Sequence, residues 1–247
     1  MRLNFLINKD YLVSHSLWSY EQGGFSSDEN QKDILDFVNA VWNKSKIAYE
    51  LLSGKLIPDG FITKASTLSE LVSSATKSKS ALSDIKRLPE FTKVFKQTEA
   101  YLKSCKSQWT QNFSKTEEAI KELTGLALDK NFTVYITHPS LRNGRNFGKI
   151  GTTFLFAWGR VEDWPNYITV YFWHEILHSY FDKSELSHAV IQLLTDNELR
   201  VRLNGGKYPP FEGHPNLFPM MEKLLPRWKK YLESKSKNIQ KFLELAK

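Results

Sequence analysis

Residues 166–181 read NYITVYFWHEILHSYF, and inside this stretch residues 174–178 form the pattern H-E-x-x-H. On a helix, positions four apart lie on one face, so His174 and His178 can direct their imidazole nitrogens at a single ion. Glu175 follows the first histidine and can reach a water on that ion. Two neutral imidazoles and a carboxylate base are the parts of a zinc hydrolase. The stretch therefore predicts an active-site helix that binds Zn²⁺.

The composition around the pattern predicts that this helix is buried. Glu175 is the one acid between residues 166 and 181, and the stretch contains no Lys or Arg. Because buried carboxylates and imidazoles are costly unless they are paired or bind metal, the apolar surroundings favour a metal site. The alternative is a buried cluster of His174, Glu175 and His178 that is hydrogen-bonded without an ion.

The start of the helix is also predicted. Asp163 is a suitable N-cap, and Pro165 fits the first turn, where its missing N–H costs little. The β-branched and aromatic run Ile168–Trp173 is also compatible with a strand. We favour a helix because the metal spacing requires one and because the capping signals precede it.

A catalytic zinc ion usually has three protein ligands, so a third one is expected downstream. Phe181 and Ser184 stand where the metzincin pattern has a glycine and a histidine, which excludes that class. Glu185 and His188 lie seven and ten residues past His178. Neither fits a spacing that we recognise.

Glu198 lies twenty residues past His178, on a helix that the apolar periodicity predicts over Glu185–Leu203. Gly205 and Gly206 supply the signal that ends this helix. A solvated helix glutamate is the ordinary alternative for Glu198.

This arrangement resembles the gluzincins, the thermolysin-like and aminopeptidase-like class of zinc peptidases. In that class, a glutamate on the helix after the H-E-x-x-H helix completes the site. The resemblance implies His174, His178 and Glu198 as metal ligands and Glu175 as the general base. It extends over roughly residues 150–205 and depends on these four positions.

Three neighbours of Glu198 qualify this assignment. Asp196 is the nearest competing ligand. Thr195 and Arg202, at i−3 and i+4 from Glu198, are placed to orient its carboxylate. The thermolysin-like pattern favours an aspartate where this chain has Arg202, so that subgroup fits poorly.

The resemblance also implies a donor for the developing oxyanion, often a Tyr or His outside the ligand set. Tyr208 and His214 are the main candidates because they lie in the Gly- and Pro-rich loop GGKYPPFEGHPN. Tyr180 and His188 are further candidates, and no spacing rule selects among the four.

Two segments are predicted to be strands, Phe132–Thr137 and Gly151–Val161. Zincins have a small sheet whose edge strand lies over the active-site helix and pairs with an extended peptide substrate. The resemblance makes Gly151–Val161 the candidate edge strand. The alternative is an interior strand without substrate contact.

The whole chain is predicted to have an α+β fold. A zincin-like catalytic region with a small mixed sheet is expected over residues 130–247, after a mostly helical region over residues 1–129. Residues 1–18 suggest one or two strands that join the later sheet. Helices are expected over residues 29–52, 90–128 and 218–245, and short helices with loops over residues 63–86.

Composition limits the classes of protein to consider. The chain has 247 residues with 13% aromatic residues, which indicates a folded protein with an adequate core. Cys105 is the only cysteine, so no disulfide framework is expected. The first residues lack the pattern of a signal peptide, and no uncharged run is long enough for a membrane span. We therefore expect a soluble cytoplasmic protein.

The net charge is +7, with basic residues concentrated in Ser73–Ser107 and again from Arg227 to Lys230. Such patches bind nucleic acids or acidic membranes in some proteins, but no nucleic-acid motif accompanies them here. The predicted function is thus hydrolysis of a peptide or protein substrate. One rival is a regulatory or binding protein with a zincin fold that acts on one dedicated partner. The other is a nucleic-acid-binding protein with a fortuitous H-E-x-x-H.

Overall fold

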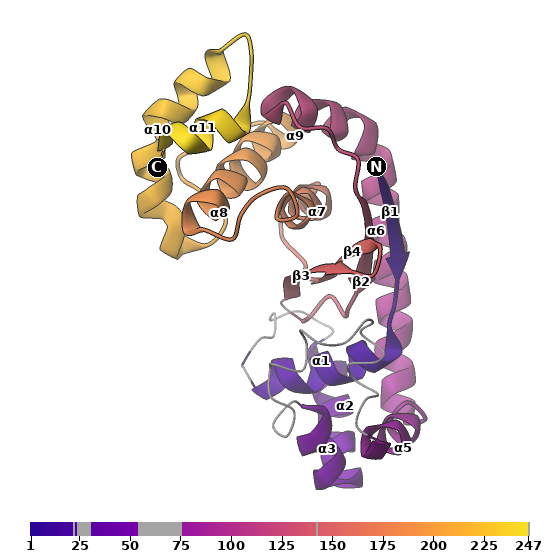
Figure 1. Ribbon diagram of the computed structural model, residues 1–247. Helices are drawn as coiled ribbons and strands as arrows, with labels where there is room; N and C mark the ends of the chain where they lie inside the picture. The colour runs from indigo at the N-terminus through magenta and orange to yellow at the C-terminus, as the bar shows by residue number, and fades with distance from the viewer. Residues whose placement is uncertain (22, 24–30, 54–75, 142, 247) are drawn as a thin grey trace. The chain divides into compact units, whose positions relative to one another are not determined.

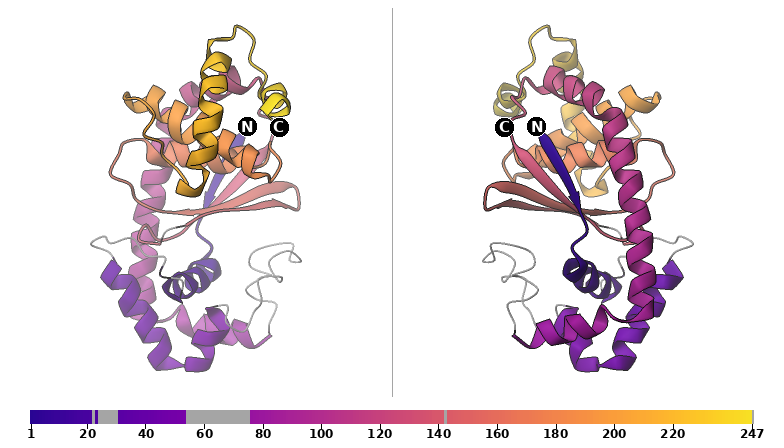
Figure 2. Two further views of the ribbon diagram at one scale, coloured as in Figure 1. Left: turned by 90° about the vertical axis from the view of Figure 1, so that its left-hand side faces the viewer. Right: turned by 90° about the vertical axis from the view of Figure 1, so that its right-hand side faces the viewer.

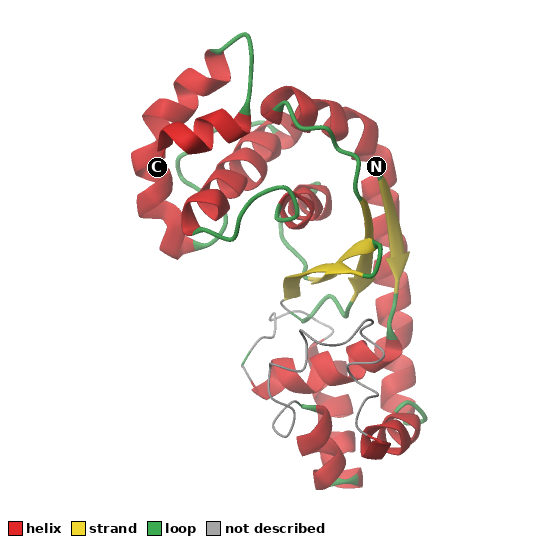
Figure 3. Ribbon diagram, in the orientation of Figure 1, coloured by secondary structure: helices red, strands yellow, loops and turns green. Residues whose placement is uncertain are grey.

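The computed structural model describes residues 1–21, 23, 31–53, 76–141 and 143–246 (Figure 1). The chain forms two compact units. The sheet unit comprises residues 2–104 and 131–161, and the helical unit comprises residue 1 with residues 105–130 and 162–247. The strands described all belong to the sheet unit, whereas the described elements of the helical unit are helices (Figure 3). This division differs from the expected boundary near residue 130, because strands from both sides of that boundary pair in one sheet.

The sheet has four strands in the order β1-β2-β4-β3. β1 pairs in parallel with β2, β2 pairs in parallel with β4, and β3 and β4 form an antiparallel hairpin. The strands are β1 (Arg2–Leu6), β2 (Asn131–Ile136), β3 (Asn143–Ile150) and β4 (Thr153–Gly159). The predicted α+β class with a small mixed sheet is confirmed, as is a strand at the N-terminus that joins this sheet.

β4 is an interior strand, so the expectation of an edge strand at Gly151–Val161 is wrong. Its neighbours are β2 and β3, and the edges of the sheet are β1 and β3. The residues from Leu155 to Gly159 are all buried. A near-continuous apolar run of this kind is typical of a strand that is covered on both faces.

Helix α1 (Lys9–Glu21) lies against one face of the sheet, and shorter helices of the sheet unit lie on its other side (Figure 2). Tyr11 packs with Leu155 and Ala157 on the sheet, while Leu12 and Leu17 belong to the core formed with the helices. Those helices are α2 (Gln31–Lys44), α3 (Lys46–Leu52), α5 (Thr76–Ile85) and the first part of α6 (Pro89–Thr124).

Local capping explains where these elements differ from the predicted ones. The side chain of Asn8 accepts hydrogen bonds from the N–H groups of Asp10 and Tyr11, at 3.1 and 3.0 Å, so a helix begins there instead of a second strand. Ser45 caps α3 by accepting from the N–H of Ala48 at 3.2 Å, which splits the helix expected over residues 29–52. Most of the expected segment 63–86 lies outside the described residues.

The helical unit contains the second part of α6 and a series of helices that follow residue 162 (Figure 1). α8, the π-helix η2 and α9 follow one another directly and match the predicted helix over Glu185–Leu203. The C-terminal segment is two helices instead of one. The elements are α7 (Tyr167–Leu177), α8 (Glu185–Gln192), η2 (Leu193–Leu199), α9 (Arg200–Asn204), the 3-10 turn η3 (Pro215–Leu217), α10 (Phe218–Glu233) and α11 (Ile239–Ala246). Over the described residues, no helix has the length and apolar character needed to cross a membrane.

Candidate metal centre

Helix α7 carries the H-E-x-x-H pattern, and every residue from Ile168 to Leu177 is buried. The helix begins later than expected: its N-cap is Asn166, in a left-handed conformation with a φ of 61°, and not Asp163. Asn166 is held by side-chain amides, because it accepts from Asn112 and donates to Asn204, each at 2.8 Å. These bonds to α6 and α9 fix the start of α7 in place of a side-chain cap.

One face of α7 packs against the second part of α6. The ring of Trp173 lies 5.4 Å from that of Trp109 and 6.4 Å from that of Phe113, measured between centroids. Its indole N–H donates to the hydroxyl of Thr116 at 2.8 Å. The aromatic run that also resembled a strand is thus the core-facing surface of a helix.

Three imidazoles converge at the end of α7. His174, His178 and His188 each offer a nitrogen, and these nitrogens all lie within 4.8 Å of one another. His174 lies in the last turn of α7 and His178 is the C-cap of that helix, whereas His188 lies in the first turn of α8, which Ser184 caps. The Nε2 atoms of His174 and His188 are 3.2 Å apart. Nitrogens that share a tetrahedral zinc ion at ordinary bond lengths stand about 3.3 Å apart, so this pair already has the spacing of two ligands.

Asp196 orients the first histidine from η2. Its carboxylate lies 3.0 and 3.1 Å from Nδ1 of His174, which leaves Nε2 facing the other imidazoles. The hydroxyl of Thr195 lies 2.9 Å from the same carboxylate. A carboxylate on the second nitrogen of a metal-binding histidine fixes its tautomer and makes it a stronger ligand. Asp196, the predicted competitor for metal ligation, therefore contacts the nitrogen of His174 that does not face the other imidazoles.

Burial and neighbouring charges set the protonation of the cluster. Burial, together with the charges of the neighbouring histidines, lowers the pKa of His178 to about 3 and that of His188 to about 4. Burial alone would lower the pKa of His174, but the charge and hydrogen bond of Asp196, with the charge of Glu175, raise it. Burial also raises the pKa of Glu175 to about 7. Two of the imidazoles are thus neutral near pH 7, as metal ligands must be.

Two imidazole nitrogens at 3.2 Å cannot both present lone pairs to each other, so a proton or a cation has to separate them. A protonated His174 that donates to both Asp196 and His188 satisfies this condition without metal. A metal ion bound to both Nε2 atoms satisfies it equally. The donor set therefore fits a metal ion of the kind that imidazole ligands favour.

Glu198 is not brought to the three imidazoles, contrary to its predicted role as the third ligand. Its carboxylate accepts from Arg202 Nε at 2.8 Å and from the hydroxyl of Tyr208 at 2.7 Å. Within the described residues, the group with metal-binding spacing contains His188 in its place. The ten residues from His188 to Glu198 correspond to about 15 Å of helix, so these two side chains are well separated along the same helical segment.

Tyr208 and Tyr180, two of the candidates for oxyanion stabilisation, have their hydroxyls engaged elsewhere. Tyr208 donates to Glu198 and accepts from the indole N–H of Trp228 at 3.0 Å. The hydroxyl of Tyr180 accepts from the N–H of Lys130 at 3.1 Å. These three hydrogen bonds tie the helical unit together and engage both hydroxyls away from the imidazoles.

His214, the remaining candidate, lies beside the cluster. Its ring centroid is 4.9 Å from that of His188 and 6.2 Å from that of His174. Gly213 makes this approach feasible: it has a φ of 114°, and a Cβ there would lie 2.6 Å from Gln192 Oε1 and 2.9 Å from Asp196 Oδ2. The loop therefore packs its backbone directly on Gln192 and on Asp196, the residue that contacts His174 Nδ1.

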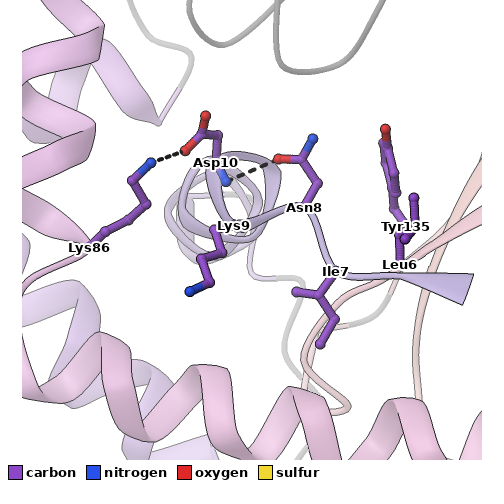
Figure 4. A pocket seen from close by; sticks show the side chains of 7 residues that line it. All are labelled: Leu6, Ile7, Asn8, Lys9, Asp10, Lys86 and Tyr135. Carbon is purple, nitrogen blue, oxygen red and sulfur yellow. Dashed lines mark hydrogen bonds and ion pairs between the residues drawn. The ribbon is translucent and has the colours of Figure 1, made fainter.

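The sheet unit contains a hollow of about 350 Å³ beside the start of α1 (Figure 4). Lys86 and Asp10 form an ion pair at 2.5 Å along it, and Asn8 caps α1. The ammonium group of Lys9 lies 4.2 Å from the ring centroid of Phe95. The polar groups of this hollow thus have structural partners, and we assign no ligand to it.

Comparisons with known proteins give no match: no family model, no curated protein and no solved structure is similar to this chain.

Proposed function

We propose that this protein is a zinc-dependent peptidase whose metal ligands are His174, His178 and His188. The convergence of three imidazole nitrogens on the helix that carries Glu175 supports the proposal most directly. The assignment keeps both histidines of the H-E-x-x-H pattern and replaces Glu198 with His188. The resemblance to gluzincins then rests on the H-E-x-x-H helix alone, and a zincin-like arrangement remains part of the proposal.

Zinc is the proposed ion because three neutral imidazoles suit it and because hydrolysis needs no redox chemistry. When bound, it would supply Lewis-acid polarisation of a carbonyl and a water of lowered pKa. Three protein ligands leave a coordination position open for that chemistry.

Glu175 is the proposed general base. It adjoins His174 in sequence and is only 7% exposed. Burial raises the pKa of its carboxyl group, which makes the carboxylate a stronger base for taking a proton from the attacking water and returning it to the leaving amine. Asp196 holds the imidazole of His174 in the tautomer that keeps Nε2 available. His214 is the proposed donor to the oxyanion, since it stands next to the ligands while the two tyrosines are bonded elsewhere.

Glu175→Gln tests this function because glutamine has nearly the same shape but cannot take up the proton. We expect the variant to bind zinc at the wild-type level and to lose at least about a hundredfold in kcat on a mixed library of fluorogenic peptides. Glu198→Gln is the matched control, because Glu198 is a half-buried glutamate of the helical unit that lies outside the proposed site. This variant should keep most of the activity. Full activity in Glu175→Gln with zinc bound would exclude this mechanism.

A further inference from the structure

The helical unit also contains a concave site that shares no residue with the proposed metal centre. It is a cavity of about 840 Å³ between α10 and α11. Its size falls in the range of pockets that hold a small molecule or part of a peptide. Basic and apolar side chains line it, among them Arg227, Lys230, Lys241, Tyr231, Phe242 and Leu245.

The charged side chains that line this cavity are all cationic. Three cationic side chains line it, and its lining contains no Asp or Glu. Lys230 and Lys241 have no hydrogen bond or ion pair through their ammonium groups among the described residues, whereas Arg227 donates to the carbonyl of Leu245 at 3.1 Å. The nearby acids Glu233 and Glu244 are exposed and lie outside the lining. The cavity therefore attracts anionic groups.

The cavity also offers an apolar surface. Leu245 is 71% exposed, and it lines the same cavity as Phe242. A ligand that fits both features is an anion with an apolar part.

The shape and the ring contacts favour a peptide over the other polyanions. Binding to a membrane surface uses a helix face that lies in the plane of the interface, whereas this site is a cavity between two helices. Single-stranded nucleic acids need free aromatic faces for stacking. The ring of Tyr231 is already stacked on Trp228, with centroids 5.3 Å apart, and lies 5.0 Å from Phe242. Its hydroxyl donates to the carbonyl of Leu123 at 2.7 Å.

We propose that the cavity between α10 and α11 binds an acidic peptide segment that carries an aliphatic side chain. The carboxylates of the segment pair with Lys230 and Lys241, and its aliphatic side chain packs on Leu245 and Phe242. If the protein is the proposed peptidase, this segment belongs to its substrate and is held outside the metal centre. Only this link to a substrate rests on the proposed function.

The test uses a fluorescein-labelled peptide in which two Leu residues stand among Glu residues, added to the full chain carrying Glu175→Gln. Fluorescence anisotropy then reports binding independently of hydrolysis. We expect saturable binding that weakens at least about tenfold when Lys230→Glu and Lys241→Glu are combined. The matched control combines Lys229→Glu with Lys235→Glu, two exposed lysines outside the cavity, and should change binding by less than about twofold. A peptide with Ser in place of both Leu residues should bind several-fold more weakly.

Three outcomes would overturn the proposal. The first is no saturable binding of the acidic peptide. The second is an equal loss in both double variants, which would mean attraction by net charge alone. The third is displacement of the peptide by vesicles containing phosphatidylserine, or by single-stranded DNA, at lower concentrations than by unlabelled peptide. Because zinc content and hydrolysis are measured separately, a failure here leaves the proposed function untouched.

Discussion

The side-chain amide of Asn197 and the backbone of Glu212 form a reciprocal pair of hydrogen bonds. Asn197 Nδ2 donates to the carbonyl of Glu212 at 3.2 Å, and the N–H of Glu212 donates to Asn197 Oδ1 at 3.0 Å. Nδ2 also donates to the carbonyl of Gln192, five residues earlier, at 2.9 Å. At this point the α-helical hydrogen-bond pattern of α8 gives way to that of the π-helix η2. The π-turn thus fixes the loop that carries His214.

Asn197→Ala should therefore separate catalysis from metal binding. The variant leaves the backbone groups of Glu212 without their partners, which should lower the free energy of unfolding by roughly 1–3 kcal/mol. Zinc content should stay near the wild-type value because Asn197 supports none of the three ligands. Hydrolysis should fall more than zinc content as His214 loses its position. Unchanged hydrolysis in a folded variant would contradict the role of this contact.

Gly213→Ala should be more destabilising than its backbone conformation alone explains. Gly213 and Gly206 both have positive φ, at 114° and 94°, but a Cβ at Gly206 would meet nothing within 4 Å. Both alanine variants carry the strain of a positive φ, so the difference between them measures the contact of Gly213 with Gln192 and Asp196. We expect Gly213→Ala to lose about 1–3 kcal/mol more in chemical denaturation. Equal losses would mean that the loop does not pack there as described.

His15 should make the sheet unit less stable in acid. Burial, with the charge of Arg145, lowers its pKa to about 3, and its ring is stacked on Tyr11 with centroids 5.2 Å apart. The unfolded chain binds a proton below about pH 6.5 while the folded chain does not, so stability falls as the pH drops from 6.5 toward 3. Between pH 7 and pH 5, this proton binding lowers the free energy of unfolding by roughly 2 kcal/mol.

His15→Gln removes this contribution and can still bond Ser19. Urea denaturation at both pH values should show that the variant loses less stability on acidification than the wild type. His178 and His188 act in the same direction, so the comparison of the two proteins is what isolates His15. A parallel pH dependence in both would contradict a buried neutral His15.

Thr116→Val should destabilise the helix that carries the candidate site. The substitution keeps the shape of the side chain but leaves the buried indole N–H of Trp173 without its acceptor. We expect a loss of about 1–3 kcal/mol in the free energy of unfolding. Thr116→Ser retains the hydroxyl and should lose less; the reverse order of stability would show that the hydrogen bond is unimportant.

Local signals in the sequence were sufficient for several elements. The H-E-x-x-H spacing and the capping signals before it predicted a helix at α7, and its apolar surroundings predicted that this helix is buried. Apolar periodicity, with the glycines at Gly205 and Gly206, bounded the helical segment after it. The strand at Phe132–Thr137 and the N-terminal strand were also predicted. Capping by Asn8 and Ser45 was overlooked, and it changed the elements that follow each of them.

The ligand set could not be predicted from spacing because it depends on how two helices meet. The short connection after His178 returns the chain so that the first turn of α8, with His188, reaches the end of α7. Glu198 lies about 15 Å further along that helix, where Arg202 and Tyr208 engage it. The available signal was the capping residue Ser184, which places His188 in the first turn of the helix after α7.

The most direct test is the metal content of the purified protein, measured by elemental mass spectrometry for the wild type, His188→Ala and Glu198→Ala. The account predicts about one zinc ion per wild-type chain, a loss of at least about tenfold in zinc affinity for His188→Ala, and wild-type zinc content for Glu198→Ala. Zinc retained by His188→Ala and lost by Glu198→Ala would contradict it and restore Glu198 as the third ligand. A wild-type protein that takes up no zinc even when zinc is supplied would leave the three histidines as a protonated, metal-free cluster.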